Sequence, residues 1–193
     1  AHHHYFRAGP GFIHSHAPGL LVLSRYPIID AHFHRYSVNG KPHKIHHIDW
    51  WFAKGVGLVR VDAGSVVGEM DIFVTHLVSC YVPWGKAFPE DEYGAQRAAQ
   101  AWECARWIRL VRRAPLVLLL CDMNADAHSL PYRVICHVAG VRPLPGMLDR
   151  PTFDGSEGKA QVDHVLWDAT AWKPAGACHQ WGGAARISDH VAV

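Results

Sequence analysis

The sequence lacks the features that mark several broad classes of protein. Its five cysteines are an odd number, widely spaced and without a CxxC pair, so neither a disulfide framework nor a zinc finger is indicated. No apolar run approaches the roughly 18 residues needed to cross a bilayer, and no signal-peptide pattern is visible. Charged residues make up only 19% of the chain and leave a net charge of +2, without the basic patch usual in nucleic-acid binders. We therefore expect an intracellular protein with no transmembrane segment in this chain and no nucleic-acid partner.

Length and hydrophobic patterning predict one domain over residues 1–193. The chain is 49% hydrophobic, which is enough for a sizeable core, and no repeat or linker divides it. A hairpin turn is expected at Asn39–Gly40. Apolar or alternating runs predict strands over residues 20–24, 31–37, 56–61, 71–77, 116–120, 163–167 and 187–193.

Two helices are expected between these strands. The longer one begins at the acidic turn 90–92, stops at Pro115 and carries a basic, solvated face. A shorter helix is expected over residues 129–138. The apolar face of the longer helix is predicted to consist of Ala98, Ala101, Trp102, Ala105 and Ile108. A strand-rich chain with two helices predicts an α/β sandwich, in which two sheets pack together under helices.

Asp122 and Asn124 follow directly on a buried apolar run. A strand would hold both side chains on one face at its carboxyl end. An acid and an amide in that place can bind a hard metal ion or orient a water molecule beside a phosphate. A plain β-turn is the alternative reading, because Asp and Asn are common turn residues.

Asp163 and the terminal Ser188-Asp189-His190 are the second acidic feature. An imidazole near neutral pH accepts a proton from water, and a carboxylate on its other nitrogen fixes the tautomer. Asp163 and His190 could form such a pair, and Asp189 would add a carboxylate for a metal ion. The alternative is that Asp163 caps a loop and His190 is a core histidine.

Three further sites combine polar groups or aromatic rings near these motifs. His76 continues the buried face of its strand, which suits a core histidine. Asp49 and Lys54 form either a phosphate-binding charge or an ordinary loop salt bridge. Trp50, Trp51 and Phe52 would be costly to expose on a monomer, so they either pack in the core or insert at a lipid interface.

Several segments resemble a known superfamily. The motifs DIFVTHL (71–77), PLVLLLCDMNAD (115–126), QVDHVLW (161–167) and ISDHVAV (187–193) are similar to those of the endonuclease/exonuclease/phosphatase superfamily, which includes DNase I-like nucleases. SRYPI (24–28), SVNGKPHKIHH (37–47) and QRAAQAWE (96–103) resemble the neutral sphingomyelinases within it.

The resemblance implies a DNase I-like sandwich, incomplete at its amino terminus, and a magnesium-dependent phospholipase C, with manganese as an alternative ion. The substrate would be sphingomyelin or a related phospholipid at a membrane surface, with membrane association in the full-length protein. By the same resemblance His190 is the general base with Asp163, and Asp189 is a metal ligand. Asp122 and Asn124 lie near the phosphate and attacking water, and His76 contacts the phosphate.

One part of the family pattern is missing from the sequence. Family members carry an Asn and then a Glu near their amino terminus, and that Glu is a principal magnesium ligand. No glutamate of this chain stands in that context. The resemblance therefore implies weakened magnesium binding. Another phosphodiesterase or nuclease of the superfamily, or a non-catalytic remnant, are the alternative functions.

Overall fold

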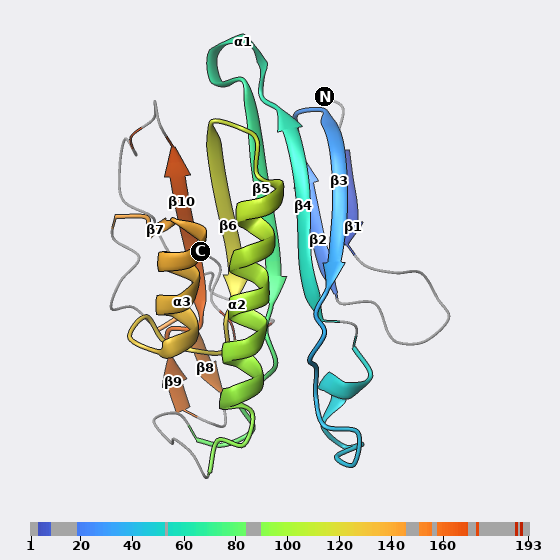
Figure 1. The fold of residues 1–193 in the computed structure, drawn as a ribbon, viewed down its shortest axis with the longest axis vertical. Helices are drawn as coiled ribbons and strands as arrows, with labels where there is room; N and C mark the ends of the chain where they lie inside the picture. The colour runs from blue at the N-terminus through green and yellow to red at the C-terminus, as the bar shows by residue number, and fades with distance from the viewer. Residues whose placement is uncertain are drawn as a thin grey trace.

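The computed structural model describes a mixed sheet covered by helices on one face and by a small second sheet on the other (Figure 1). It describes the backbone of residues 4–8, then residues 19–52, 54–83, 90–145, 151–155 and 158–169, and the single residues 173, 188 and 190. The α/β class predicted from the sequence is confirmed.

Six strands form the main sheet in the order β3-β4-β5-β6-β10-β7. Among the described strands only β5 and β6 run parallel, because the long helix α2 lies between them and returns the chain to the edge at which β5 began. All other neighbouring strands are antiparallel. The strands are β3 (Ile28–Arg35), β4 (Gly55–Asp62), β5 (Glu69–His76), β6 (Leu116–Asp122), β7 (Arg142–Pro143) and β10 (Asp163–Ala169).

Helices α2 (Gly94–Val111) and α3 (Leu130–Ala139) cover one face of this sheet (Figure 1). The Ser129 hydroxyl accepts the N–H of Tyr132 and so caps α3 as an N-cap residue does. The acidic turn predicted to open α2 precedes the helix instead, since no acidic residue lies in its first turn.

The predicted buried face of α2 is partly wrong. Ala101, Ala105 and Ile108 are fully buried, but the Trp102 side chain is 50% exposed. The buried face is completed by polar side chains, among them Gln100, whose amide accepts the N–H of Val78 and donates to the carbonyl of Val38. These hydrogen-bonded polar side chains occupy the buried face of α2 to which the spacing of apolar residues had assigned Trp102.

The opposite face of the sheet carries strands β1 (His4–Ala8) and β2 (Leu20–Ser24), which pair antiparallel. Val22 of β2 packs with three buried valines of the main sheet to form a second, smaller core, made by Val59, Val61 and Val74. The described residues thus contain one large sheet and a small second layer. The remaining elements are the short helices η1 (Ile48–Trp50) and α1 (Gly64–Val67) and the two-stranded sheet of β8 (Phe153–Gly155) and β9 (Gly158–Ala160).

The predicted hairpin turn at Asn39–Gly40 is wrong. Strands β3 and β4 do pair antiparallel, but residues 36–54 connect them and include η1. Neither Asn39 nor Gly40 has the positive φ that a tight type I′ turn requires. Gly40 is needed for another reason: a Cβ there would lie 2.6 Å from the backbone nitrogen of Trp50.

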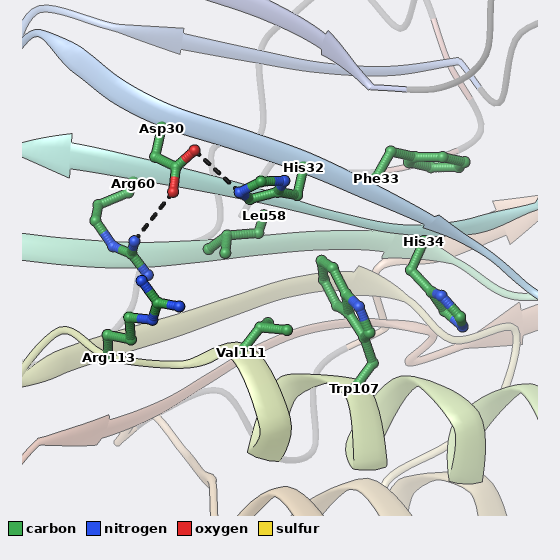
Figure 2. A pocket seen from close by; sticks show the side chains of 9 residues that line it. All are labelled: Asp30, His32, Phe33, His34, Leu58, Arg60, Trp107, Val111 and Arg113. Carbon is green, nitrogen blue, oxygen red and sulfur yellow. Dashed lines mark hydrogen bonds and ion pairs between the residues drawn. The ribbon is translucent and has the colours of Figure 1, made fainter.

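A cavity of about 350 Å³ lies between β3, β4 and the second half of α2 (Figure 2). Asp30 bridges Arg60 and His32 at its edge, and Trp107 forms part of its apolar wall. None of the described candidate site residues lines it. The strand ends described next are therefore a separate feature.

Candidate active site

The sheet brings three candidate residues together at one edge. His76 ends β5 and Asp122 ends β6, and the two are paired in the parallel register. Asp163 begins the antiparallel strand β10 and pairs with Asp122 on the other side. The side chains of three adjacent strands therefore meet at the carboxyl ends of β5 and β6, a place where α/β sheets commonly bind ligands.

Asp163 and His190 form the predicted acid–imidazole pair. Oδ2 of Asp163 lies 2.8 Å from Nδ1 of His190, although 27 residues separate them in the chain. A carboxylate at Nδ1 selects the tautomer with the proton on that nitrogen, and proton transfer then takes place at Nε2. The structure thus provides an oriented imidazole beside the strand ends.

Residues of β8 and the turn before it hold this pair in place. The hydroxyl of Thr152 accepts the backbone N–H groups of Val162 and Asp163, at 3.0 and 2.9 Å, which fixes the start of β10. Phe153 forms an isolated antiparallel bridge with His190, and their rings meet edge to face at 5.3 Å. Sequence reasoning did not identify Thr152 or Phe153, because a lone threonine or phenylalanine in a loop gives no signal of its own.

Asp122 is the most perturbed carboxyl group of the site. Burial, and then repulsion from Asp163, raise the pKa of Asp122 to about 6. Nε2 of His76 lies 3.4 Å from its Oδ2. Burial, and then the nearby charge of Lys54, lower the pKa of His76 to about 3, so this ring is neutral at pH 7. Asp122 consequently has no full positive charge in direct contact with it among the described residues.

Asn124 lies in a turn and not on the strand. β6 ends at Asp122, whose Oδ1 accepts the backbone N–H of Asn124 at 2.9 Å. Asn124 has φ 47°, the only positive value among the described non-glycine residues. Its Nδ2 donates to the carbonyl of Leu77 at 3.2 Å. The segment is therefore an Asx-type turn, and the turn places the amide beside the other site residues. A role of these two residues toward a metal ion or a water molecule stays a prediction.

Asp49 and Lys54 form a buried ion pair next to the site. Their side chains are only 2% and 3% exposed, and Lys54 Nζ lies 2.9 Å from Asp49 Oδ1. Asp49 also accepts the N–H of Ser79 at 2.6 Å and the hydroxyl of Tyr81 at 3.2 Å. Burial would raise the pKa of Asp49, but the charge and hydrogen bonds of Lys54 outweigh it and lower that pKa. Ser79 and Tyr81 are further residues that the sequence pattern did not reveal.

Lys54 links this pair to the strand ends. Its Nζ donates to the Leu77 carbonyl at 3.0 Å, the same oxygen that Asn124 contacts. Burial lowers the pKa of Lys54 against the opposing effect of Asp49. As described, Lys54 is satisfied by protein groups, which favours the salt-bridge reading of the two offered by the sequence.

The carboxylates at the strand ends offer the oxygen ligands that a hard divalent cation prefers. Ligand atoms of Asp122, Asp163 and His190 all lie within 4.8 Å of one another. Burial first, and then repulsion between the Asp122 and Asp163 carboxylates, raise the pKa of Asp122 in this partly buried place. A bound cation that prefers oxygen ligands would offset the repulsion between the two carboxylates. Asp189 and the predicted strand 187–193, apart from Ser188 and His190, lie outside the described residues.

Comparison with known proteins assigns the family. Residues 1–190 match the endonuclease/exonuclease/phosphatase family, and the chain belongs to it. It is 41% identical to sphingomyelin phosphodiesterase 2 of Mus musculus over 155 residues, which is 80% of this chain and 34% of the mouse protein. The corresponding Rattus norvegicus protein is 37% identical over 155 residues, covering 80% of this chain and 33% of that protein. The chain therefore spans about a third of the length of the curated relatives that it matches.

Solved structures agree on the fold. The crystal structure of a Staphylococcus aureus beta toxin variant with bound magnesium ions superimposes with a TM-score of 0.63 at 14% identity. The match covers 96% of this chain and 67% of the toxin chain. The resemblance to neutral sphingomyelinases inferred from the sequence is supported by the two sphingomyelin phosphodiesterase relatives. No described helix is both long enough and apolar enough to cross a membrane.

Proposed function

We propose that the protein is a magnesium-dependent phosphodiesterase that hydrolyses sphingomyelin to ceramide and phosphocholine, within a DNase I-like sandwich of two packed sheets. The observation that carries this proposal is the 2.8 Å contact between Asp163 and His190 beside Asp122, at the carboxyl ends of the central strands. The similarity to sphingomyelin phosphodiesterases over 80% of the chain supports the substrate. Membrane association would follow from that substrate.

His190 would act as the general base. Asp163 holds the proton on Nδ1, so Nε2 takes a proton from the water that attacks phosphorus. The carboxylate then stabilises the imidazolium that forms. The new bond joins the water oxygen to phosphorus, and the bond to the ceramide oxygen breaks with its electron pair. That oxygen is finally protonated from solvent, and the imidazolium releases its proton to solvent, which restores the neutral base.

The neighbouring polar groups would position the phosphate. Asn124 and Asp122 are tied to each other by the turn, so they offer a fixed pair of polar side chains to the phosphate and to the attacking water. His76 is neutral at pH 7 and would donate a hydrogen bond to a phosphate oxygen or to the leaving oxygen. Asp49 and Lys54 would contribute to substrate binding indirectly, because Lys54 holds the Leu77 carbonyl that Asn124 also contacts.

Asp122 and Asp189 are the carboxylates that we propose to hold the magnesium ion, or manganese in its place. When bound, the ion supplies positive charge that polarises the phosphodiester. The beta toxin of the same fold was solved with magnesium bound, which supports this choice of ion.

The test measures hydrolysis of sphingomyelin and of duplex DNA by the unmodified protein and by the variant His190→Ala. We expect the protein to release phosphocholine from sphingomyelin with magnesium, and His190→Ala to remove most of that activity. Duplex DNA under the same conditions should stay intact. Cleavage of DNA without cleavage of sphingomyelin would replace the lipid assignment by a nuclease. Calorimetric titration with magnesium provides the second criterion, because no saturable binding at millimolar concentration would indicate a non-catalytic remnant.

A further inference from the structure

The loop that holds Asp49 reverses the usual distribution of polar and apolar side chains. Asp49 is 2% exposed, whereas its neighbours Ile48 and Trp50 are 58% and 41% exposed. Ile45 and Trp51 in the same loop are 67% and 45% exposed. Large apolar side chains that gather on one short surface segment commonly mark an interaction site. We call these four residues the loop patch.

Polar contacts fix the loop and so keep these side chains at the surface. Asp49 binds Ser79, Tyr81 and Lys54, as described above. The indole N–H of Trp51 donates to the carbonyl of Ile45 at 3.1 Å, which closes the loop on itself. The indole nitrogen is thus already satisfied, and what Trp51 presents is an apolar ring. The patch is therefore preformed and needs little ordering before it binds.

Two lysines and one histidine tie the loop to the start of α2. Lys41 and Lys44 both form ion pairs with Glu92. The His47 ring stacks on Tyr81 with centroids 3.9 Å apart, and its Nδ1 lies 2.8 Å from the hydroxyl of Tyr93. One carboxylate pairs with both lysines, so this cluster keeps a single net positive charge.

The loop patch lies at the same end of the molecule as the candidate active site. Figure 1 places η1 and its loop beyond the carboxyl ends of β5 and β6. The link is direct: Asp49 pairs with Lys54, and Lys54 and Asn124 share the carbonyl of Leu77. A surface that meets the loop patch therefore also faces the side on which His76 and Asp122 end their strands.

We propose that Ile45, Ile48, Trp50 and Trp51 insert into the surface of a zwitterionic, phosphocholine-containing bilayer and so bring lipid headgroups to the active site. Tryptophan and isoleucine suit the boundary between headgroups and acyl chains, where apolar surface leaves water. The choice of a zwitterionic surface follows from charge, because Lys41, Lys44 and Glu92 leave only one net positive charge. Recognition of an anionic membrane typically uses a cluster of about four to eight Lys or Arg. This inference rests on the proposed function, since it assumes that the substrate is a membrane lipid.

The test measures binding separately from catalysis. Sucrose-loaded vesicles of phosphatidylcholine and sphingomyelin are sedimented with the protein, with the double variant Trp50→Ala/Trp51→Ala, and with Ile45→Ser/Ile48→Ser. The second pair leaves the Trp51 indole and its hydrogen bond in place. The matched control is Trp102→Ala/Leu110→Ala, which removes an equally exposed Trp and an exposed Leu from α2. Thermal melting confirms that each variant is folded.

We expect either loop-patch variant to bind vesicles at least about tenfold more weakly, given the apolar area each removes, and the control to bind as the unmodified protein does. Turnover of sphingomyelin in vesicles should fall with binding. Turnover of a water-soluble phosphocholine ester should stay within about twofold, because the patch lies outside the polar site.

Three results would overturn the inference. Unchanged vesicle binding by both loop-patch variants would do so, and so would an equal loss in the control. Self-association of the unmodified protein in sedimentation velocity, abolished by the loop-patch variants, would assign the patch to a second copy of the chain. If the unmodified protein hydrolyses neither substrate, the proposed function fails, and vesicle binding still decides the role of the patch.

Discussion

Replacing Lys54 by Met should strongly destabilise the protein, because it leaves the Asp49 carboxylate buried without a charged partner. The two side chains are 3% and 2% exposed, and no bulk solvent reaches them to screen the loss. Met keeps most of the aliphatic stem of lysine, so packing changes little. Removing one member of such a buried pair typically costs about 3–5 kcal/mol. The hydrogen bonds from Ser79 and Tyr81 remain, which places the expected cost near the lower value.

The complementary variant tests the sign of the pH dependence. In Asp49→Asn, Lys54 keeps its charge without a counter-charge, and its pKa, already lowered by burial, should fall further. A lysine whose folded pKa lies below its unfolded value of 10.5 loses its proton first in the folded state. Folded stability therefore rises with pH in the window between the two values. We expect Asp49→Asn to cost less at pH 9.5 than at pH 7.

Urea unfolding followed by circular dichroism measures both effects. The matched control is Lys159→Met, which removes a lysine that is 68% exposed in its pair with Asp154 and should cost less than about 1 kcal/mol. The double variant Asp49→Leu/Lys54→Met should recover most of the lost stability. The reasoning would be refuted if Lys54→Met cost no more than the control, or if the double variant were no more stable than Lys54→Met.

Two further predictions concern the active site. His190→Ala should lower turnover by roughly two to four orders of magnitude with magnesium affinity nearly unchanged. Adding Asp163→Asn to that variant should lower turnover little further, because the two groups act as one unit. Fully additive losses in steady-state kinetics would show that Asp163 and His190 work independently. Asp122→Asn should abolish turnover yet stabilise the protein in EDTA above pH 6 by up to about 3 kcal/mol, since burial and Asp163 raise the Asp122 pKa from 3.8 to about 6. In the unmodified protein, the stability contributed by the raised pKa of Asp122 is present below pH 3.8 and is lost as the pH rises through 6. The variant should therefore be no more stable than the unmodified protein at pH 3.5. A variant less stable than the unmodified protein at pH 8 would contradict this prediction.

The sequence predicted the elements that hold the site because their signals are local. The apolar runs before His76 and Asp122 predicted β5 and β6, and the shorter helix expected over residues 129–138 is α3. The pairing of Asp163 with His190 was also predicted, from the terminal motif and its resemblance to the superfamily. The structure then places the two atoms 2.8 Å apart.

Other features depend on contacts between distant segments, and no local pattern reports them. Asn39–Gly40 has the composition of a tight hairpin, but Gly40 is required by the backbone of Trp50 that packs against it. Trp102 has the helical spacing of a core residue, but Gln100 occupies the buried face through hydrogen bonds to two other segments. Thr152 positions Asp163 from eleven residues away. Each of these roles follows from tertiary packing, which overrides local propensity.

The most direct test of the central claim follows the fate of the attacking water. Hydrolysis of sphingomyelin in ¹⁸O-labelled water with magnesium should place the label in phosphocholine and none in ceramide, as measured by mass spectrometry, and His190→Ala should suppress the labelled product. This result is predicted because water activated by His190 attacks phosphorus and the ceramide oxygen leaves. Label in ceramide, release of free choline, or equal product with His190→Ala would contradict the account.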